Sequence, residues 1–342
     1  MNNGFEVDLY DPGTDPAPEH WDTFVDAASI FPVWRWSVVR ATASCGGRHT
    51  AAVIRDGSSP IALALVRLRR LGPLLVADID PPGTSALPGL VFAGSTHGRL
   101  GRANLDPAMV RDVVAALEST LGDRYGRRLA LVWFRQVFAD MLPSIMTTTT
   151  LTYAGAPVTY LHNEFDSYAA YLRTLRKSRR VDQARLVRRL DEDPRLTIVH
   201  GPTPEGFDPA PFYRQSDETA LRNHHQRFPP LRIQPRAVRD ALVFDTSALL
   251  LRYVDCGELI GCALTVDNAI MPLSSAWGAL DPHRGGRSGL WFDQMARVAR
   301  WTIESGRTGI IGGKGLPLLK AELGYEVVPQ WTVVRRLARY AA

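Results

Sequence analysis

A dense run of positive charge is the first feature of this sequence that could do chemistry. The segment YLRTLRKSRRVDQARLVRRL, residues 171–190, carries eight arginines and lysines against one carboxylate, Asp182. At about 100° per residue its apolar residues share one helical face, but Arg179 and Gln183 interrupt that face. Such a helix would be buried at both ends and line a polar cavity in its middle. Alternatively, it is a surface helix whose arginines lay their stems over the core and keep their charges in water. The apolar face comprises Tyr168, Leu172, Leu175, Leu186 and Leu190.

The composition of the 342 residues is that of a soluble chain, with 45% apolar and 22% charged residues. The net charge of +5 suits a phosphate-bearing partner without requiring one. The polar, acidic N-terminus is unlike a signal peptide, and no segment has 18 uninterrupted apolar residues. We therefore expect a cytoplasmic protein of two similar domains with no membrane segment.

Metal binding is not expected from the residues that could act as ligands. The cysteines, Cys45, Cys256 and Cys262, are three in number and lack CxxC spacing, and the eight histidines show no ligand spacing either. We expect the cysteines to be small buried residues in strands.

The C-terminal half predicts a clear order of elements. Three antiparallel strands are expected at residues 249–255, 259–266 and 269–280, joined by short turns. A glycine-rich loop then leads into a helix with Ser288 as its N-cap and Gly306 as its stop. The buried side of that helix is predicted to hold Leu290, Met295, Val298, Ala299 and Ile303. A strand at 307–313, a short helix at 316–324 and a final strand at 325–337 follow.

The N-terminal half repeats this order more weakly. Residues 49–68 indicate a strand, a turn and a strand, 105–122 a helix, 127–133 a strand and 137–144 a short helix. The separations between corresponding positions are 175 residues for Asp106 and Asp281 and 179 for Arg128 and Arg307. Two copies of one unit fit this pattern better than two unrelated domains. We predict an α/β protein with mixed sheets and two domains, 1–155 and 156–342. The second would include the basic helix, 166–191, and a proline-rich insert, 201–236, with a helix from Phe212 to His225.

Three further groups of residues carry a family resemblance. The first is Tyr171, Leu172 and Leu175 followed by the cations Arg176, Lys177, Arg179 and Arg180. The second is Phe212, Tyr213, Thr219 and Arg222, and the third is Gly312, Gly313, Lys320 and Gly324. With them, the repeated unit resembles the GNAT acyltransferase fold, and its doubling resembles the FemAB-like branch of that superfamily. Members of that branch carry two GNAT-like halves and attach an aminoacyl group from aminoacyl-tRNA to an amine. The resemblance spans roughly residues 160 to 330, and the N-terminal half shares only the layout.

The resemblance implies a site for each chemical task. The basic helix would face a cleft between the halves and meet phosphate there, through Arg176, Lys177, Arg179 and Arg180. Backbone N–H groups of the strand before the glycine loop, near Ser274 to Trp277, could hold the acyl oxygen if that strand splays from its neighbour. The predicted catalytic residues are Ser275, Trp277 and, as a general base of suitable pKa, His225 of the pair at 224 and 225. Tyr213, Arg222 and Lys320 complete the predicted substrate-binding set.

The donor remains open between tRNA and coenzyme A. A GNAT enzyme binds acyl-CoA with a Q/R-x-x-G-x-G/A loop, and the local match at His283, Gly286 and Ser288 departs from it at two of three positions. Residues of this loop could still bind phosphate, namely Gly285, Gly286, Arg287 and Ser288. The corresponding N-terminal loop ends in Asp106 and Pro107 and is not expected to bind CoA. We predict an amide-forming transferase with aminoacyl-tRNA as co-substrate, a small-molecule or peptide amine as acceptor and no permanently bound cofactor. The alternatives are an acyl-CoA N-acyltransferase and a non-catalytic RNA- or partner-binding protein.

Overall fold

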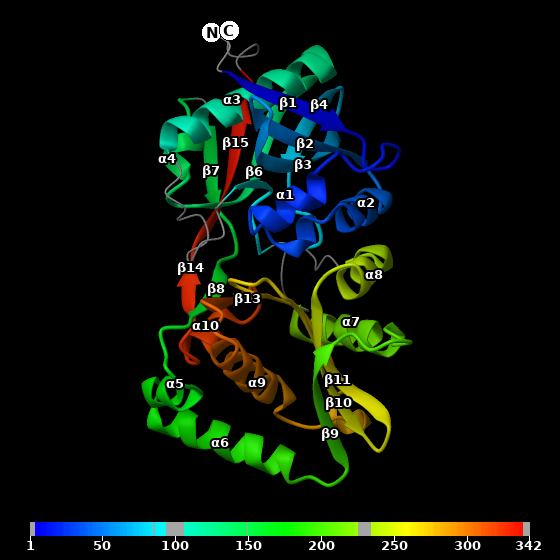
Figure 1. The fold of residues 1–342 in the computed structure, drawn as a ribbon, viewed down its shortest axis with the longest axis vertical. Helices are drawn as coiled ribbons and strands as arrows, with labels where there is room; N and C mark the ends of the chain where they lie inside the picture. The colour runs from blue at the N-terminus through cyan, green and yellow to red at the C-terminus, as the bar shows by residue number, and fades with distance from the viewer. Residues whose placement is uncertain (1–3, 85, 94–105, 149, 225–233, 338–342) are drawn as a thin grey trace. The chain divides into compact units, whose positions relative to one another are not determined.

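The computed structural model describes residues 4–84, 86–93, 106–148, 150–224 and 234–337. Its contacts divide the chain into two compact units: unit 1 contains Met1–Val158 and Val328–Ala342, and unit 2 contains Thr159–Val327. Each unit has one mixed sheet with helices packed against it (Figure 1). The mixed α/β architecture predicted from the sequence is therefore confirmed.

The elements of unit 1 are β1 (Phe5–Tyr10), α1 (Trp21–Ala27), η1 (Pro32–Trp34), α2 (Trp36–Ser44), β2 (Arg48–Asp56), β3 (Ser59–Leu71), β4 (Leu74–Ile79), β5 (Leu90–Phe92), α3 (Pro107–Tyr125), η2 (Gly126–Arg128), β6 (Leu129–Phe138), α4 (Leu142–Ile145), β7 (Thr150–Ala154) and β15 (Gln330–Arg336). The sheet has the strand order β1-β2-β3-β4-β6-β15-β7, with β5 paired to β3. β4 and β6 run parallel, and the strands around them are antiparallel.

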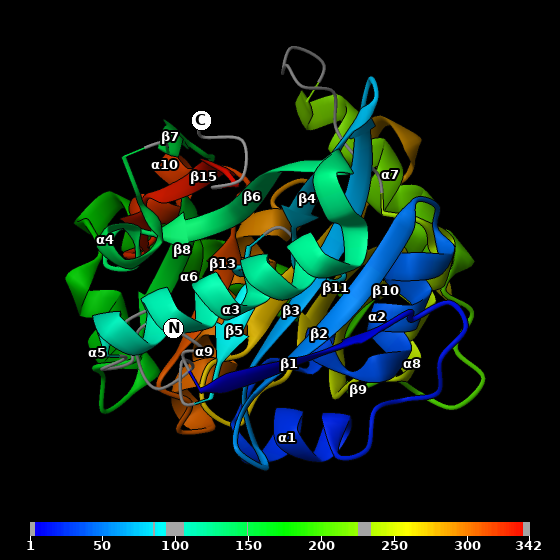
Figure 2. The same cartoon turned by 90° about the horizontal axis from the view of Figure 1, so that it is seen from above.

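Helix α3 covers one face of this sheet (Figure 2). It begins where Asp106 accepts a hydrogen bond from the Ala108 amide, with Pro107 in the first helical position, and it ends at Gly126, whose φ is 62°. Its buried residues recur at helical spacing and pack into the core of unit 1, because a stripe of this period faces one side of a helix. They are Val110, Val113, Val114, Leu117 and Leu121.

The elements of unit 2 are β8 (Val158–His162), α5 (Tyr168–Thr174), α6 (Lys177–Asp191), β9 (Leu196–Pro202), α7 (Ala210–His224), α8 (Arg236–Phe244), β10 (Ala248–Asp255), β11 (Glu258–Val266), β12 (Leu273–Ala279), η3 (Pro282–Arg284), α9 (Leu290–Glu304), β13 (Gly309–Gly313), α10 (Pro317–Ala321) and β14 (Glu326–Val328). The sheet has the strand order β14-β8-β13-β12-β11-β10-β9. The predicted meander is present as β10, β11 and β12, and the helix of the insert is α7.

Helix α9 has the predicted buried side, with Leu290, Met295, Val298, Ala299 and Ile303 all in the core. Its predicted N-cap is wrong, because the N-cap position is Gly289 and no side chain caps the helix. Gly289 has φ 86°, and a Cβ there would lie 2.8 Å from the side chain of Leu186 on α6. A residue with a side chain would be strained at this position in both respects.

The basic segment forms two helices where the sequence indicated one. α5 ends at Thr174 and α6 begins at Lys177, with Leu175 and Arg176 in extended conformation between them. Leu175 is buried in the core of unit 2, so the break lets a single apolar side chain turn inward while the charged residues stay outside. Gln183 is buried in α6, as the interrupted stripe predicted, and Arg179 is half-buried.

The chain passes between the two sheets twice. The predicted final strand, 325–337, is two strands: β14 ends the sheet of unit 2, and after Pro329 the chain enters unit 1 as β15, between β6 and β7. Proline has no N–H to donate, so it interrupts the ladder at the crossing point. In the same way β8, which follows β7, lies between β13 and β14. The predicted second domain, 156–342, runs to the last residue, whereas contacts group Val328–Ala342 with unit 1.

Two of the three cysteines differ from their predicted positions. Cys262 is buried in β11, but Cys45 follows α2 and Cys256 lies in a turn with φ 49°, and both are exposed. Within the described part of the chain, no helix is long and apolar enough to cross a membrane.

Candidate active site

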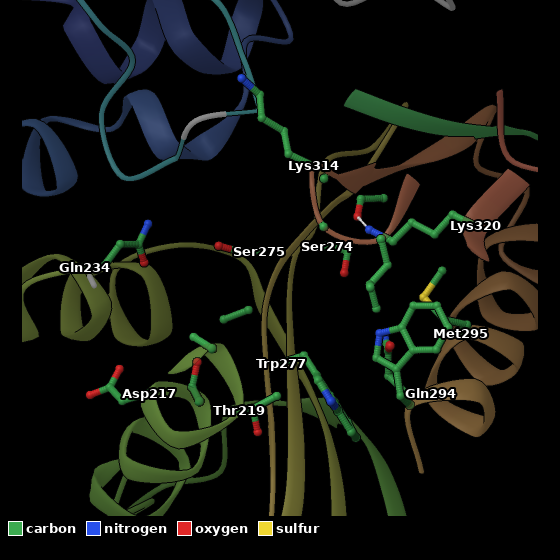
Figure 3. A pocket seen from close by; sticks show the side chains of 18 of the residues that line it. Asp217, Thr219, Gln234, Ser274, Ser275, Trp277, Gln294, Met295, Lys314 and Lys320 are labelled. Atoms are coloured by element: carbon green, nitrogen blue, oxygen red, sulfur yellow. Dashed lines mark hydrogen bonds between the residues drawn. The ribbon is translucent and has the colours of Figure 1, made fainter. Parts of the chain in front are cut away.

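A cavity of about 310 Å³ opens in unit 2 where two parallel strands part. β12 and β13 share a single register pair, Leu273 with Ile311, and then diverge. The walls come from β12, from the end of β13 and the segment after it, and from helices α7, α9 and α10 (Figure 3). The sequence predicted that acyl-group chemistry would require such a splay beside Ser274 to Trp277, and these residues line the cavity.

A bulge in β12 sets the position of Ser275. Leu264 of β11 pairs with Ala276 and the next residue, Thr265, pairs with Ser274, so Ser275 is the extra residue. Bulges redirect side chains and often occur beside active sites. The Ser275 Oγ is buried and has no hydrogen-bond partner among the described residues. Its hydroxyl therefore has an unused donor in a residue that lines the cavity.

Lys320 brings a buried charge to the same cavity. It extends from α10, its side chain is 6% exposed, and its Nζ donates a hydrogen bond to the carbonyl of Gly312 (Figure 3). Burial lowers the pKa of Lys320 to about 8, which still leaves it largely protonated at neutral pH. A Cβ on Gly312 would lie 2.7 Å from the Thr159 hydroxyl, so glycine is needed where this segment packs against β8.

The α7 side of the cavity carries an ion pair that the sequence did not indicate. Arg239 donates to both oxygens of Asp217, at 2.8 and 3.2 Å, and lies 4.7 Å from the centre of the Tyr213 ring. Tyr213 in turn donates to Asp240 at 2.9 Å, and burial together with that carboxylate raises the pKa of Tyr213. The Tyr213 ring therefore packs against the Arg239 guanidinium, and Tyr213 does not line the cavity itself.

Arg222, another predicted substrate-binding residue, ties α7 to the end of β12. It donates to Asp281 at 2.7 Å, to the Ala279 carbonyl at 2.8 Å and to the Thr219 hydroxyl at 3.0 Å. These three bonds to protein partners fix its guanidinium, so its geometry is that of a structural residue.

Two groups of the predicted donor loop are bonded within the protein, the Gly286 amide and the Arg287 guanidinium. The main chain of Asp281 accepts from the amides of Arg284 and Gly286, at 2.8 and 3.0 Å. Arg287 is paired with Asp255 at 2.6 Å and with Asp193 at 3.3 Å. None of Gly285, Gly286, Arg287 and Ser288 lines the cavity.

The four predicted phosphate-binding cations lie outside this cavity, Arg176 just before α6 and the other three on it. Arg176 and Lys177 are exposed and Arg180 is half-buried, and none of the three has an ion-pair partner in the described parts of the chain. Arg179 is different, because it pairs with Glu322 and lies 5.3 Å from the centre of the Phe292 ring. The structure thus leaves three of the four cations open to a partner.

Of the predicted catalytic residues, Trp277 lines the cavity with its ring edge-on to Tyr253, and His225 lies outside the described residues. Met295 of α9 also lines the cavity, although its helical spacing indicated only a core residue.

In the described ranges, no group of three or more His, Cys, Asp or Glu could hold a metal ion. That the reaction requires no metal stays a prediction.

Comparison with known proteins places the fold. No protein-family model and no curated protein matches the chain. Among solved structures, FemX aligns with a TM-score of 0.64 at 10% identity, over 97% of this chain and 98% of FemX. L-PGS from Bacillus licheniformis aligns at 0.57 and 14%, over 94% and 93%. The C-terminal domain assigned to a lysylphosphatidylglycerol synthetase from Agrobacterium fabrum aligns at 0.56 and 13%, over 94% and 92%. At such identities the likeness concerns the fold, and the tandem GNAT-like, FemAB-like fold predicted from the sequence is confirmed.

Proposed function

We propose that the protein is an acyltransferase that forms an amide in the cavity between β12 and β13, with aminoacyl-tRNA as donor. The observation that carries the proposal is the parting of these strands beside an unpartnered hydroxyl, Ser275, and a buried ammonium, Lys320. The shared fold of FemX and L-PGS supports the same class of reaction.

The reaction would be a direct displacement at the ester that links the amino acid to the ribose. A neutral amine attacks the carbonyl carbon, a C–N bond forms, and the ester C–O bond breaks. The amine gives up a proton and the ribose oxygen leaves as a hydroxyl after taking one. Negative charge develops on the carbonyl oxygen in between, and a fixed donor such as Ser275 or a buried cation such as Lys320 lowers its free energy. Binding both reactants in one cavity supplies the remaining advantage.

The contacts of the donor loop support tRNA over CoA. A CoA pyrophosphate would need free amides in the loop before α9, but the Gly286 amide bonds to Asp281, and Leu186 packs against Gly289. The exposed cations of α6 supply the charge that a polyanionic donor requires. An aminoacyl-tRNA donor would place the reaction in the cytoplasm.

The test mixes the purified protein with either charged tRNA or labelled acyl-CoA and a panel of amines. We expect transfer of the labelled aminoacyl group to an amine from charged tRNA, and none from acyl-CoA. Deacylated tRNA with free amino acid is the control for uncatalysed coupling. Transfer from acyl-CoA but not from charged tRNA would show that the donor is acyl-CoA. Binding of tRNA without transfer to any amine would favour a non-catalytic RNA-binding protein.

A further inference from the structure

Unit 2 contains a second cavity, of about 300 Å³, on the side formed by α5, α6 and α9. It shares no residue with the cavity between β12 and β13. Its walls combine an apolar surface with polar groups. The residues used below are Tyr168, Leu172, Gln183, Val187, Arg188 and Arg300.

Gln183 is the unusual member of this wall. Its side chain is 5% exposed, and neither its Oε1 nor its Nε2 has a hydrogen-bond partner among the described residues. Burying a polar group without a partner is unfavourable, so such groups are rare in folded proteins. An amide that offers one acceptor beside one donor matches a ligand with the complementary pair on one edge.

Two arginines border the same cavity and are open to a ligand. Arg300 is exposed and lies 4.7 Å from the centre of the Tyr168 ring, and Arg188 is exposed on α6. Neither has a carboxylate partner in the part of the chain that the structure describes. The nearby Asp191 is held by Arg297 at 2.5 Å, which leaves Glu192 as the other acidic residue of the wall.

We propose that this cavity binds one unpaired nucleotide of an RNA. The base edge bonds to the Gln183 amide, the base face rests on Leu172, Val187 and the Arg300 guanidinium, and Arg188 meets the phosphate. Unpaired bases in RNA are held in this way, by stacking on guanidinium planes and by hydrogen bonds to their edges. The exposed Arg176 and Lys177 at the start of α6 favour a polyanion over a small carboxylate ligand.

The amide predicts which base fits. On its Hoogsteen edge adenine offers glutamine one acceptor and one donor, whereas the same edge of guanine offers two acceptors. A base held by that edge should therefore be adenine, and the comparison of AMP with GMP tests which edge is held. This inference rests on the proposed function, since it assigns a holding point for a single-stranded part of the RNA donor.

The experiment measures binding of a labelled adenosine hexaribonucleotide at fixed salt, with AMP, GMP and inorganic phosphate as competitors. We expect AMP to compete better than GMP, and phosphate to compete weakly. Gln183→Met should weaken binding of the hexamer at least fivefold and leave the melting temperature unchanged or higher, because it removes the partnerless amide. Arg300→Gln should also weaken binding, while Arg127→Gln, the same change at an exposed arginine of unit 1, should not.

Several results would overturn the inference. One is wild-type affinity in the Gln183→Met variant; another is equal competition by phosphate and AMP, which indicates an anion site only. Competition by a tripeptide with a free carboxylate as strong as that by AMP would assign the cavity to a peptide. The proposed function fails separately: if Gln183→Met binds RNA normally while charged tRNA still supports transfer, only the nucleotide site is wrong. If charged tRNA supports no transfer, the donor is wrong whatever the hexamer does.

Discussion

Units 1 and 2 share one order of elements and differ most at their pair of parallel strands. In unit 1, β4 and β6 stay paired from Leu75 with Leu129 to Ile79 with Phe134. In unit 2, β12 and β13 pair once and then part around a cavity. The fold alone therefore does not make the site, because a closed copy of the same strands leaves no room for a substrate.

An ion cluster holds unit 1 closed. Asp78 of β4 is completely buried and accepts hydrogen bonds from Arg135, which lies on β6 across the junction. Arg67 and Arg69 of β3 bond to the same carboxylate, at 3.1 and 2.5 Å. The carboxylate thus links three neighbouring strands where unit 2 has only the bulge at Ser275. Unit 1 has the geometry of a scaffold, and unit 2 has that of a site.

The largest expected effect follows from removing that link. Asp78→Asn leaves three arginines around a neutral side chain, and removal of one partner from a buried ion cluster costs about 3 kcal/mol or more. We expect urea unfolding to show this loss of stability, while kcat/KM of the folded protein stays near wild type. A loss of kcat/KM without a loss of stability would mean that unit 1 takes part in the chemistry.

A smaller effect is expected from the charge in the open unit. Lys320→Met keeps most of the stem and removes the ammonium, so kcat/KM should fall at least tenfold, or about 1.4 kcal/mol. The melting temperature should not fall, because the charge is costly to bury. Arg127→Met in unit 1 is the matched control and should leave kcat/KM unchanged. Full turnover in Lys320→Met would exclude this residue from the site.

The same lysine gives unit 2 a signature in the pH dependence of stability. Burial lowers its pKa from 10.5 to about 8, so between these values the unfolded chain binds more protons than the folded one. The free energy of unfolding should therefore rise with pH across this window, by up to about 1.4 kcal/mol per pH unit. Urea unfolding of wild type and Lys320→Met at pH 7.5 and 9.5 should show the rise in the wild type alone. Equal pH dependence in both proteins would contradict a buried ammonium.

The smallest effect concerns the cations at the start of α6, which have no counterpart in the closed unit. Alanine at Arg176, Lys177, Arg179 and Arg180 should weaken tRNA binding and flatten its salt dependence, by about 0.7 to 0.9 in logarithmic slope per lost phosphate contact. Because Arg179 is paired with Glu322, Arg179→Ala alone should change the slope least. An unchanged slope in the quadruple variant would show that these cations are only solvated.

The local elements of unit 2 were predictable because each has its own signal in the chain. The meander, the buried side of α9 and the interruption at Gln183 all follow from periodicity and turns. The open site was not predictable in the same way. That β12 and β13 part after one pair depends on the bulge at Ser275 and on packing between distant segments.

Side-chain partners were the hardest part to predict. The basic residues of the sequence look alike, yet Arg222 and Arg287 are bound by protein carboxylates while Arg176 is open. The ion pair between Asp217 and Arg239 could not be predicted, because residues 22 positions apart in the sequence are not neighbours in any regular helix or turn. Lys320 was named with the help of the family resemblance, and nothing in its neighbours predicts burial of an ammonium.

The return of the chain to unit 1 as β15 has a consequence for synthesis on the ribosome. β15 is the last strand of the described chain to be made, yet it lies between β6 and β7, which are made long before it. The strands of unit 2 are contiguous from β8 to β14, so its sheet can close as soon as they emerge. Unit 1 must wait with β6 and β7 unjoined, and unpaired strand edges are prone to aggregation. The unit that we assign to chemistry can therefore fold first, and the nascent scaffold is the part most in need of a chaperone.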